Sequence, residues 1–257
     1  MTYAIGGFGI VTSFSKLPEW LAWEAFGEGN GSSTFEEMQQ RLALIRLRNG
    51  IGDDELKQIG CLVLSSVVFF AENQWIRQPS DWGRQNMRYK TYDLTEGEGL
   101  RIWRECQERS VGHAVDVPAM QPELGRWGKP ALVKPRLGQG AFRVAVTDAY
   151  QRACAVTGEH SLPALEAAHI KPFSLEGPHT VRNGVLLRSD LHRLFDRGYI
   201  TVTCDHRLEV SKRLKEHFSN GKSYYPLHGS PVAVPQAVQN HPDPELLRWH
   251  NEKQFRA

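Results

Sequence analysis

His169, Asn183 and His192 have residue types and spacings that suit the hydrolysis of a phosphodiester, since successive members are 14 and 9 positions apart. Such hydrolysis needs a base that activates water, and a neutral imidazole with a pKa of about 6.5 suits that task. An amide side chain can aim the ring of the base, and one divalent cation can stabilise the charge on the phosphate. One histidine, one asparagine and one metal-binding residue therefore make a minimal nuclease site.

The segment around these residues predicts two strands followed by a helix. A first strand ends at His169, a second covers residues 185–187, and a short helix begins near Arg188. His192 and Asp196 are four residues apart, so they share one face of that helix. Both side chains are expected to point towards the strand that carries His169.

Four short sequence elements follow one another through this segment. They are Cys154-Ala-Val-Thr-Gly158, Ala167-Ala-His-Ile-Lys-Pro172, Asn183-Gly-Val-Leu-Leu187 and Leu191-His-Arg-Leu-Phe-Asp-Arg-Gly198. Together they resemble the HNH, or ββα-metal, nuclease superfamily in the form found in bacterial restriction-type endonucleases. The resemblance implies that His169 is the general base, Asn183 orients it, and His192 binds the metal. It also implies a DNA substrate, with Asp196 as a second metal ligand.

One position departs from the family pattern. Many members place an Asp or His ligand directly before the base histidine, whereas this chain has Ala168. The remaining metal ligands could be Asp196, Glu166, or substrate phosphate and water. An ion such as Mg²⁺ or Mn²⁺ commonly keeps several waters and needs few carboxylates, so the departure leaves metal binding open.

Charge is distributed unevenly along the chain. Residues 1–110 hold 12 Lys+Arg and 15 Asp+Glu, a net charge of −3, whereas residues 111–257 hold 19 and 14, a net charge of +5. A mildly basic half that also contains all ten histidines could bind a polyanion. The basic residues expected to contact DNA phosphates are Arg136, Arg143, Lys171, Arg188 and Arg193.

The patterns predict an α+β protein with two domains. Residues 1–110 are expected to form an α/β domain, residues 111–135 a proline-containing linker, and residues 136–257 the nuclease domain. Within the first domain, capping boxes at 34–37 and 95–98 predict helix starts, and residues 61–70 predict a buried strand.

The first domain is aromatic-rich, and its tryptophans include two in a polar loop. Trp75, Trp82 and Tyr92 are candidates for the walls of a modified-base pocket, because loop aromatics can stack on an extruded base. The order of its elements loosely resembles EVE and other PUA-like domains, some of which read modified bases. That resemblance implies a modification-dependent restriction enzyme, with an N-terminal reader and a C-terminal nuclease.

Several features bear on the setting of the protein. No apolar run approaches the ~18 residues of a membrane span, and the four cysteines form no CxxC pair, so we expect a cytoplasmic protein without a membrane partner. A double-strand cut requires two active sites or two visits, so a homodimer is compatible with this function. Two alternatives stay open: a catalytically degenerate nucleic-acid-binding domain, and a nuclease acting on RNA or on branched or nicked DNA.

The remaining histidines have a simpler interpretation. A lone histidine is more often structural or solvated than catalytic, and we expect this of seven of them. These are His160, His179, His206, His217, His228, His241 and His250.

Overall fold

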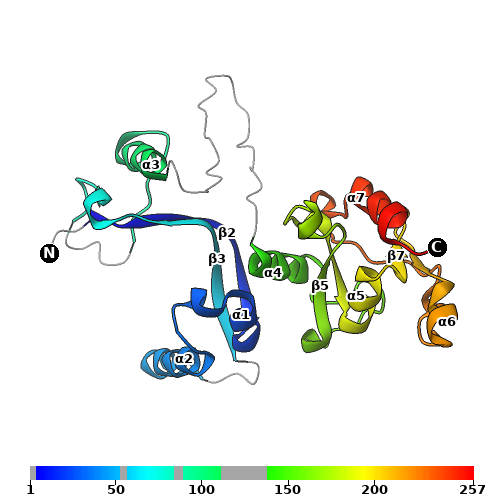
Figure 1. The fold of residues 1–257 in the computed structure, drawn as a ribbon. Coiled ribbons are helices and arrows are strands. Elements are labelled where there is room, and N and C mark those ends of the chain that lie inside the picture. The colour runs from blue at the N-terminus through cyan, green and yellow to red at the C-terminus, as the bar shows by residue number, and fades with distance from the viewer. Residues whose placement is uncertain (1–3, 53–56, 84–88, 111–137) are drawn as a thin grey trace. The chain divides into compact units, whose positions relative to one another are not determined.

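The computed structural model describes residues 4–52, 57–83, 89–110 and 138–257, which form helices and strands in a mixed arrangement (Figure 1). Contacts divide the described chain into two units. The first contains residues 4–14 and 62–110, and the second contains residues 15–61 and 138–257. The expected linker at 111–135, and Arg136 after it, lie outside the described residues, so the predicted domain boundary stays a prediction. No helix in the described ranges is long and apolar enough to cross a bilayer.

The first unit is built on short antiparallel pairings. Its elements are β1 (Ala4–Ile5), the start of β2 (Gly7–Pro18), most of β3 (Gln58–Phe69), a 3₁₀ turn (Glu72–Gln74), β4 (Ile76–Arg77) and α3 (Gly97–Ser110). Strand β1 pairs with β4, and β2 pairs with β3. A small core forms around Val68, Phe70, Ile76 and Cys106. These two-stranded sheets do not confirm the expected PUA-like domain.

Strand β3 lies where a buried strand was predicted, but only some of its side chains are buried. Val63 and Val68 are 3% exposed, whereas Leu62 and Phe69 are 65% and 82% exposed. Successive side chains of a strand point to opposite faces, and β3 has a single neighbouring strand in its sheet. The prediction of full burial was therefore wrong, because a continuous apolar run does not reveal whether both faces are covered.

Helix α2 (Phe35–Asn49) begins and ends as its sequence predicts. Thr34 caps it by accepting a hydrogen bond from the Glu37 backbone N–H at 3.2 Å, and the Glu37 carboxylate accepts from the Ser33 N–H at 2.8 Å. Gly50 ends the helix at φ 63°, in the left-handed region that favours glycine.

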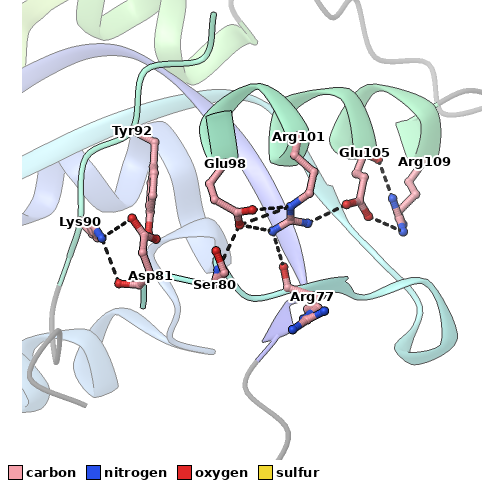
Figure 2. Close-up of polar contacts among 9 residues, drawn as sticks. All are labelled: Arg77, Ser80, Asp81, Lys90, Tyr92, Glu98, Arg101, Glu105 and Arg109. Atoms are coloured by element: carbon pink, nitrogen blue, oxygen red, sulfur yellow. Dashed lines mark hydrogen bonds and ion pairs between the residues drawn. The ribbon is translucent and has the colours of Figure 1, made fainter. Parts of the chain in front are cut away.

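Helix α3 is present, but the capping box expected at its start is not formed. The Thr95 side chain and backbone N–H both donate to Asp93 instead. Glu98 accepts from the Ser80 N–H at 3.1 Å, as Figure 2 shows. Arg101 pairs with Glu98 at 2.7 Å and donates to the Arg77 carbonyl at 3.2 Å. Glu98 and Arg101 therefore tie the helix to the segment around β4.

The second unit holds the predicted nuclease segment. Its elements are α1 (Glu19–Phe26), a 3₁₀ turn (Gly27–Asn30), α2, α4 (Gln139–Ala149), β5 (Leu165–His169), β6 (Gly184–Arg188), α5 (Ser189–Asp196), β7 (Ile200–Val202), β8 (Leu208–Val210), α6 (Arg213–Phe218), α7 (Pro244–Trp249) and a π-helical turn (His250–Gln254). Short 3₁₀ turns also cover Leu162–Ala164, Phe173–Leu175, Val181–Asn183, Tyr225–Leu227 and Val238–Asn240. One apolar core joins α4, β5, β6 and α5.

The predicted strand–strand–helix order is confirmed. Strands β5 and β6 are antiparallel, with His169 opposite Gly184, and α5 starts directly after β6 (Figure 1). His169 ends the first strand, and His192 and Asp196 lie on the helix as expected.

Glycine at position 184 permits the close packing of α4 on β6. A Cβ added there would lie 2.4 Å from Val146 Cγ2 and 3.1 Å from the Phe142 ring. Phe142 and Val146 are 1% and 0% exposed, so neither can easily move aside. This close approach brings the ring of Phe142 against His169, across the strand pair from Gly184.

Helix α1 packs on α4 in the same unit. A Cβ at Gly140 would lie 1.8 Å from the Ala25 carbonyl oxygen, so the two backbones approach as closely as a glycine allows. Ser15 also donates to the Asp148 carboxylate. Residues around α1 therefore contribute to the surface in front of β5.

Candidate active site

An open cavity of about 930 Å³ lies in the second unit, between α1, α4, β5 and α5. It brings together four predicted site residues: Glu166 and His169 from β5, and His192 and Asp196 from α5. Its lining residues are Glu24, Ala25, Gln139, Gly140, Phe142, Arg143, Pro163, Glu166, Ala167, His169, Pro172, Phe173, His192 and Asp196.

His169 is held as a neutral imidazole. Its ring stacks on Phe142, with 3.8 Å between centroids and 10° between planes. Burial, and then the neighbouring His179, lower the pKa of His169 to about 4, although Asp196 acts in the opposite direction. At neutral pH the ring therefore carries no charge, and one nitrogen keeps a lone pair that can accept a proton.

His192 is flanked by two carboxylates. Its Nδ1 lies 2.6 Å from Glu166 Oε2, and its Nε2 lies 3.3 Å from Asp196 Oδ2. Burial disfavours a charge on this ring, but the hydrogen bonds with Asp196 and Glu166 outweigh it and raise the pKa of His192. Glu166 comes from β5 and the other two residues from α5, so the strand–helix contact assembles this group.

The chemistry of this donor group fits a divalent cation. Two ligands at about 2.1 Å from an octahedral ion lie about 3.0 Å apart, close to the 3.3 Å between His192 Nε2 and Asp196 Oδ2. Metal-binding histidines commonly donate their other N–H to a carboxylate, and Glu166 has that position. In the described ranges, no three or more such donors converge on one point, so waters or substrate oxygens would complete the coordination.

Asn183 is fully buried, and its side chain bonds to the backbone of the loop that follows His169. Its Oδ1 accepts from the Lys171 N–H at 2.8 Å, and its Nδ2 donates to the carbonyls of Lys171 and Pro178, both at 2.9 Å. Its backbone carbonyl accepts from Ile170 N–H. The residue expected to aim the His169 ring thus fixes the loop next to it.

His179 lies in the same loop and contacts the predicted base, although the sequence interpretation treated it as structural. Its Nδ1 lies 3.2 Å from His169 Nε2, and its ring stacks on Phe173. A separation of ten residues along an irregular loop carries no periodic signal. The hydrogen bonds of Asn183, together with those of the loop backbone, fold the loop back and bring the two histidines together.

The predicted phosphate-binding residues are placed differently from one another. Arg143 lines the cavity and pairs with Glu24 at 2.9 Å. Lys171 lies over the Trp249 ring at 5.8 Å, and Arg188 pairs with Asp190 at 2.7 Å. Arg193 is exposed on α5.

The three aromatic candidates of the first unit occupy separate settings. Trp75 is 43% exposed and donates from Nε1 to the Phe70 carbonyl at 3.1 Å. Tyr92 donates its hydroxyl to Asp81 at 2.8 Å, and Lys90 pairs with the same carboxylate (Figure 2). In the described segments, Trp75, Trp82 and Tyr92 make no ring contact with one another.

Comparisons with known proteins agree with this geometry. Residues 154–203, which contain β5, β6 and α5, match the family model described as HNH endonuclease. The second unit therefore contains an HNH endonuclease domain at residues 154–203. HNH nucleases generally use divalent metal ions.

The other two comparisons add less. A search of curated proteins found no match. Among solved structures, the chain is similar to one titled modification dependent TagI restriction endonuclease. The identity is 23% and the TM-score 0.35, over 45% of this chain and 38% of that chain.

Proposed function

We propose that the protein is a divalent-metal-dependent endonuclease that hydrolyses DNA phosphodiesters at the cavity in front of β5. One observation carries this proposal: a neutral His169 and the Glu166–His192–Asp196 group line the same cavity. Hydrolysis needs a proton acceptor and a charge-stabilising centre within reach of one phosphate, and this cavity offers residues for both.

Each residue has a definite role in this proposal. His169 takes a proton from the attacking water. His192, through Nε2, and Asp196 hold Mg²⁺ or Mn²⁺, while Glu166 keeps the His192 ring oriented from Nδ1. When bound there, the ion would supply Lewis-acid stabilisation of the charge that develops on the phosphate. Asn183 preserves the shape of the loop behind the base.

Charge supports a polyanionic substrate. Residues 111–257 have a net charge of +5, and Arg143 lies at the cavity itself. Arg193 and Lys171 offer further contacts to DNA phosphates, whose attraction would weaken as salt rises. The family resemblance implies products with a 5′-phosphate and a 3′-hydroxyl.

The finer assignment is a restriction-type and modification-dependent enzyme of the cytoplasm, in which the first unit reads a modified base. The polar loop around Trp75 and Trp82 supports this assignment, since Trp75 is exposed, Trp82 is half-buried, and loop aromatics can stack on an extruded base. A homodimer would supply the two active sites that a double-strand cut requires.

The test uses matched unmodified, 5-methylcytosine and 5-hydroxymethylcytosine DNA, each with Mg²⁺, Mn²⁺ or a chelator. We expect cleavage that needs the metal and that favours modified DNA. Equal cleavage of all three substrates would keep the nuclease and remove the modification reader. DNA retention without cleavage on any substrate would instead support a binding-only domain.

A further inference from the structure

The loop between β5 and β6 brings a second histidine to the proposed base. His179 Nδ1 lies 3.2 Å from His169 Nε2, and the rings meet edge to face, with centroids 5.2 Å apart at 68°. This is the arrangement in which the ring N–H of one imidazole donates to a ring nitrogen of the other. Among the described residues, no other side chain is hydrogen-bonded to the His169 ring.

Packing fixes both rings of this pair. Phe142 stacks on His169 at 3.8 Å, and Phe173 stacks on His179 with 4.3 Å between centroids. Asn183 holds the Pro178 carbonyl, one residue before His179. The loop closes tightly at Gly177, where a Cβ would lie 1.8 Å from the Lys171 carbonyl oxygen. The position of His179 is therefore built by the loop.

The shared hydrogen bond determines which nitrogen of His169 can act as the base. A neutral imidazole has one N–H and one lone pair. When His169 Nε2 carries the proton and donates to His179 Nδ1, the lone pair of His169 is on Nδ1 and can receive a proton from water. In the opposite tautomer, His169 Nδ1 carries a proton and cannot serve.

We propose that His179 is a positioning residue, which accepts a hydrogen bond from His169 Nε2 and holds the base in the tautomer that leaves Nδ1 free. This inference rests on the proposed nuclease function of His169. It assigns to His179 the orienting role that the family resemblance implies for Asn183, whose side chain instead bonds to the loop backbone.

Electrostatics are consistent with this arrangement. Burial lowers the pKa of His179, so its ring is neutral and has a lone pair to offer at neutral pH. The groups that act on His169 are His179, Asp196 and His192, and of these only Asp196 favours the protonated ring.

Two substitutions separate hydrogen bonding from packing. His179→Asn keeps an acceptor oxygen close to the position of Nδ1 but removes the ring. His179→Phe keeps a ring that can stack on Phe173 but removes the acceptor. We expect His179→Phe to lose about 10–100-fold in single-turnover cleavage rate, as is typical when the orienting partner of a histidine is lost, and His179→Asn to retain most of the rate. Equal rates for His179→Phe and the unsubstituted protein would overturn the proposal.

Ring nitrogen NMR of the histidine-labelled full chain gives a readout that does not depend on cleavage. We expect His169 to show a protonated Nε2 and an unprotonated Nδ1, and this pattern to be kept in His179→Asn but lost in His179→Phe. Protonated Nδ1 in the unsubstituted protein would overturn the proposal. If the protein cleaves no DNA, the proposed function fails, and the NMR pattern still decides whether His179 sets the tautomer.

Discussion

Replacement of Asn183 by alanine separates a loop-fixing role from a ring-aiming role. The buried side chain makes three hydrogen bonds to backbone groups, two at Lys171 and one at Pro178. A typical internal hydrogen bond contributes about 0.5–1.5 kcal/mol, and an unpaired buried group adds a penalty. We therefore expect Asn183→Ala to lower the free energy of unfolding by about 2–4 kcal/mol.

Two assays measure this effect. Urea unfolding followed by circular dichroism gives the loss of stability. Hydrogen exchange of peptides over residues 168–184 should show faster exchange at Lys171, whose N–H loses its acceptor. Cleavage should fall as well, because the loop also carries His179. A variant with unchanged stability and protected loop amides, but with a lost cleavage rate, would refute the loop-fixing role and restore direct aiming of His169.

Asn183→Asp provides a matched control of nearly the same shape. The carboxylate can still accept from the Lys171 N–H, but it faces the Lys171 and Pro178 carbonyls without a proton to donate. Burial would raise the pKa of the new carboxyl above its unfolded value. The variant should therefore gain stability relative to the unsubstituted protein as pH is lowered, and lose it as pH rises through the raised pKa.

Two further predictions concern packing and pH. Gly184→Ala places a Cβ 2.4 Å from Val146 Cγ2 and should lower the free energy of unfolding by about 1–3 kcal/mol, as measured by thermal unfolding. The control Gly52→Ala meets open space and should change stability little. Equal stability of the two variants would contradict the close α4–β6 contact. His250, which is 1% exposed and stacked on Phe195, has a pKa lowered to about 4, chiefly by burial. In the unfolded chain this histidine binds a proton below a pH of about 6.5, so the free energy of unfolding should fall by roughly 3 kcal/mol as pH drops from 6.5 to 4. Urea unfolding measured across this pH range would contradict the prediction if His250→Gln kept the full dependence of stability on pH.

The strand–strand–helix core could be predicted because its signals are local. The apolar runs that became β5 and β6 and the four-residue spacing of His192 and Asp196 specify the elements without reference to distant contacts. The cap at Thr34 and the stop at Gly50 were also correct, because capping depends on a few adjacent residues. The resemblance to a known family then supplied the roles.

Features that depend on contacts across the fold could not be predicted. The partner of Asn183 depends on how an irregular loop folds back, and the same loop brings His179 to His169. The position of Glu166 at His192 Nδ1 depends on the packing of α5 against β5. The exposure of individual β3 side chains depends on which elements cover them, and the composition of the strand carries no such information.

The most direct test of the central claim is single-turnover cleavage of DNA in Mg²⁺ by the unsubstituted protein, His169→Ala and His160→Ala. His160 is an exposed histidine of the same unit and does not line the cavity. We predict that His169→Ala loses cleavage by about 10²–10⁴-fold, while His160→Ala cleaves at the unsubstituted rate. Cleavage by His169→Ala at the full rate would contradict the assignment of His169 as the base.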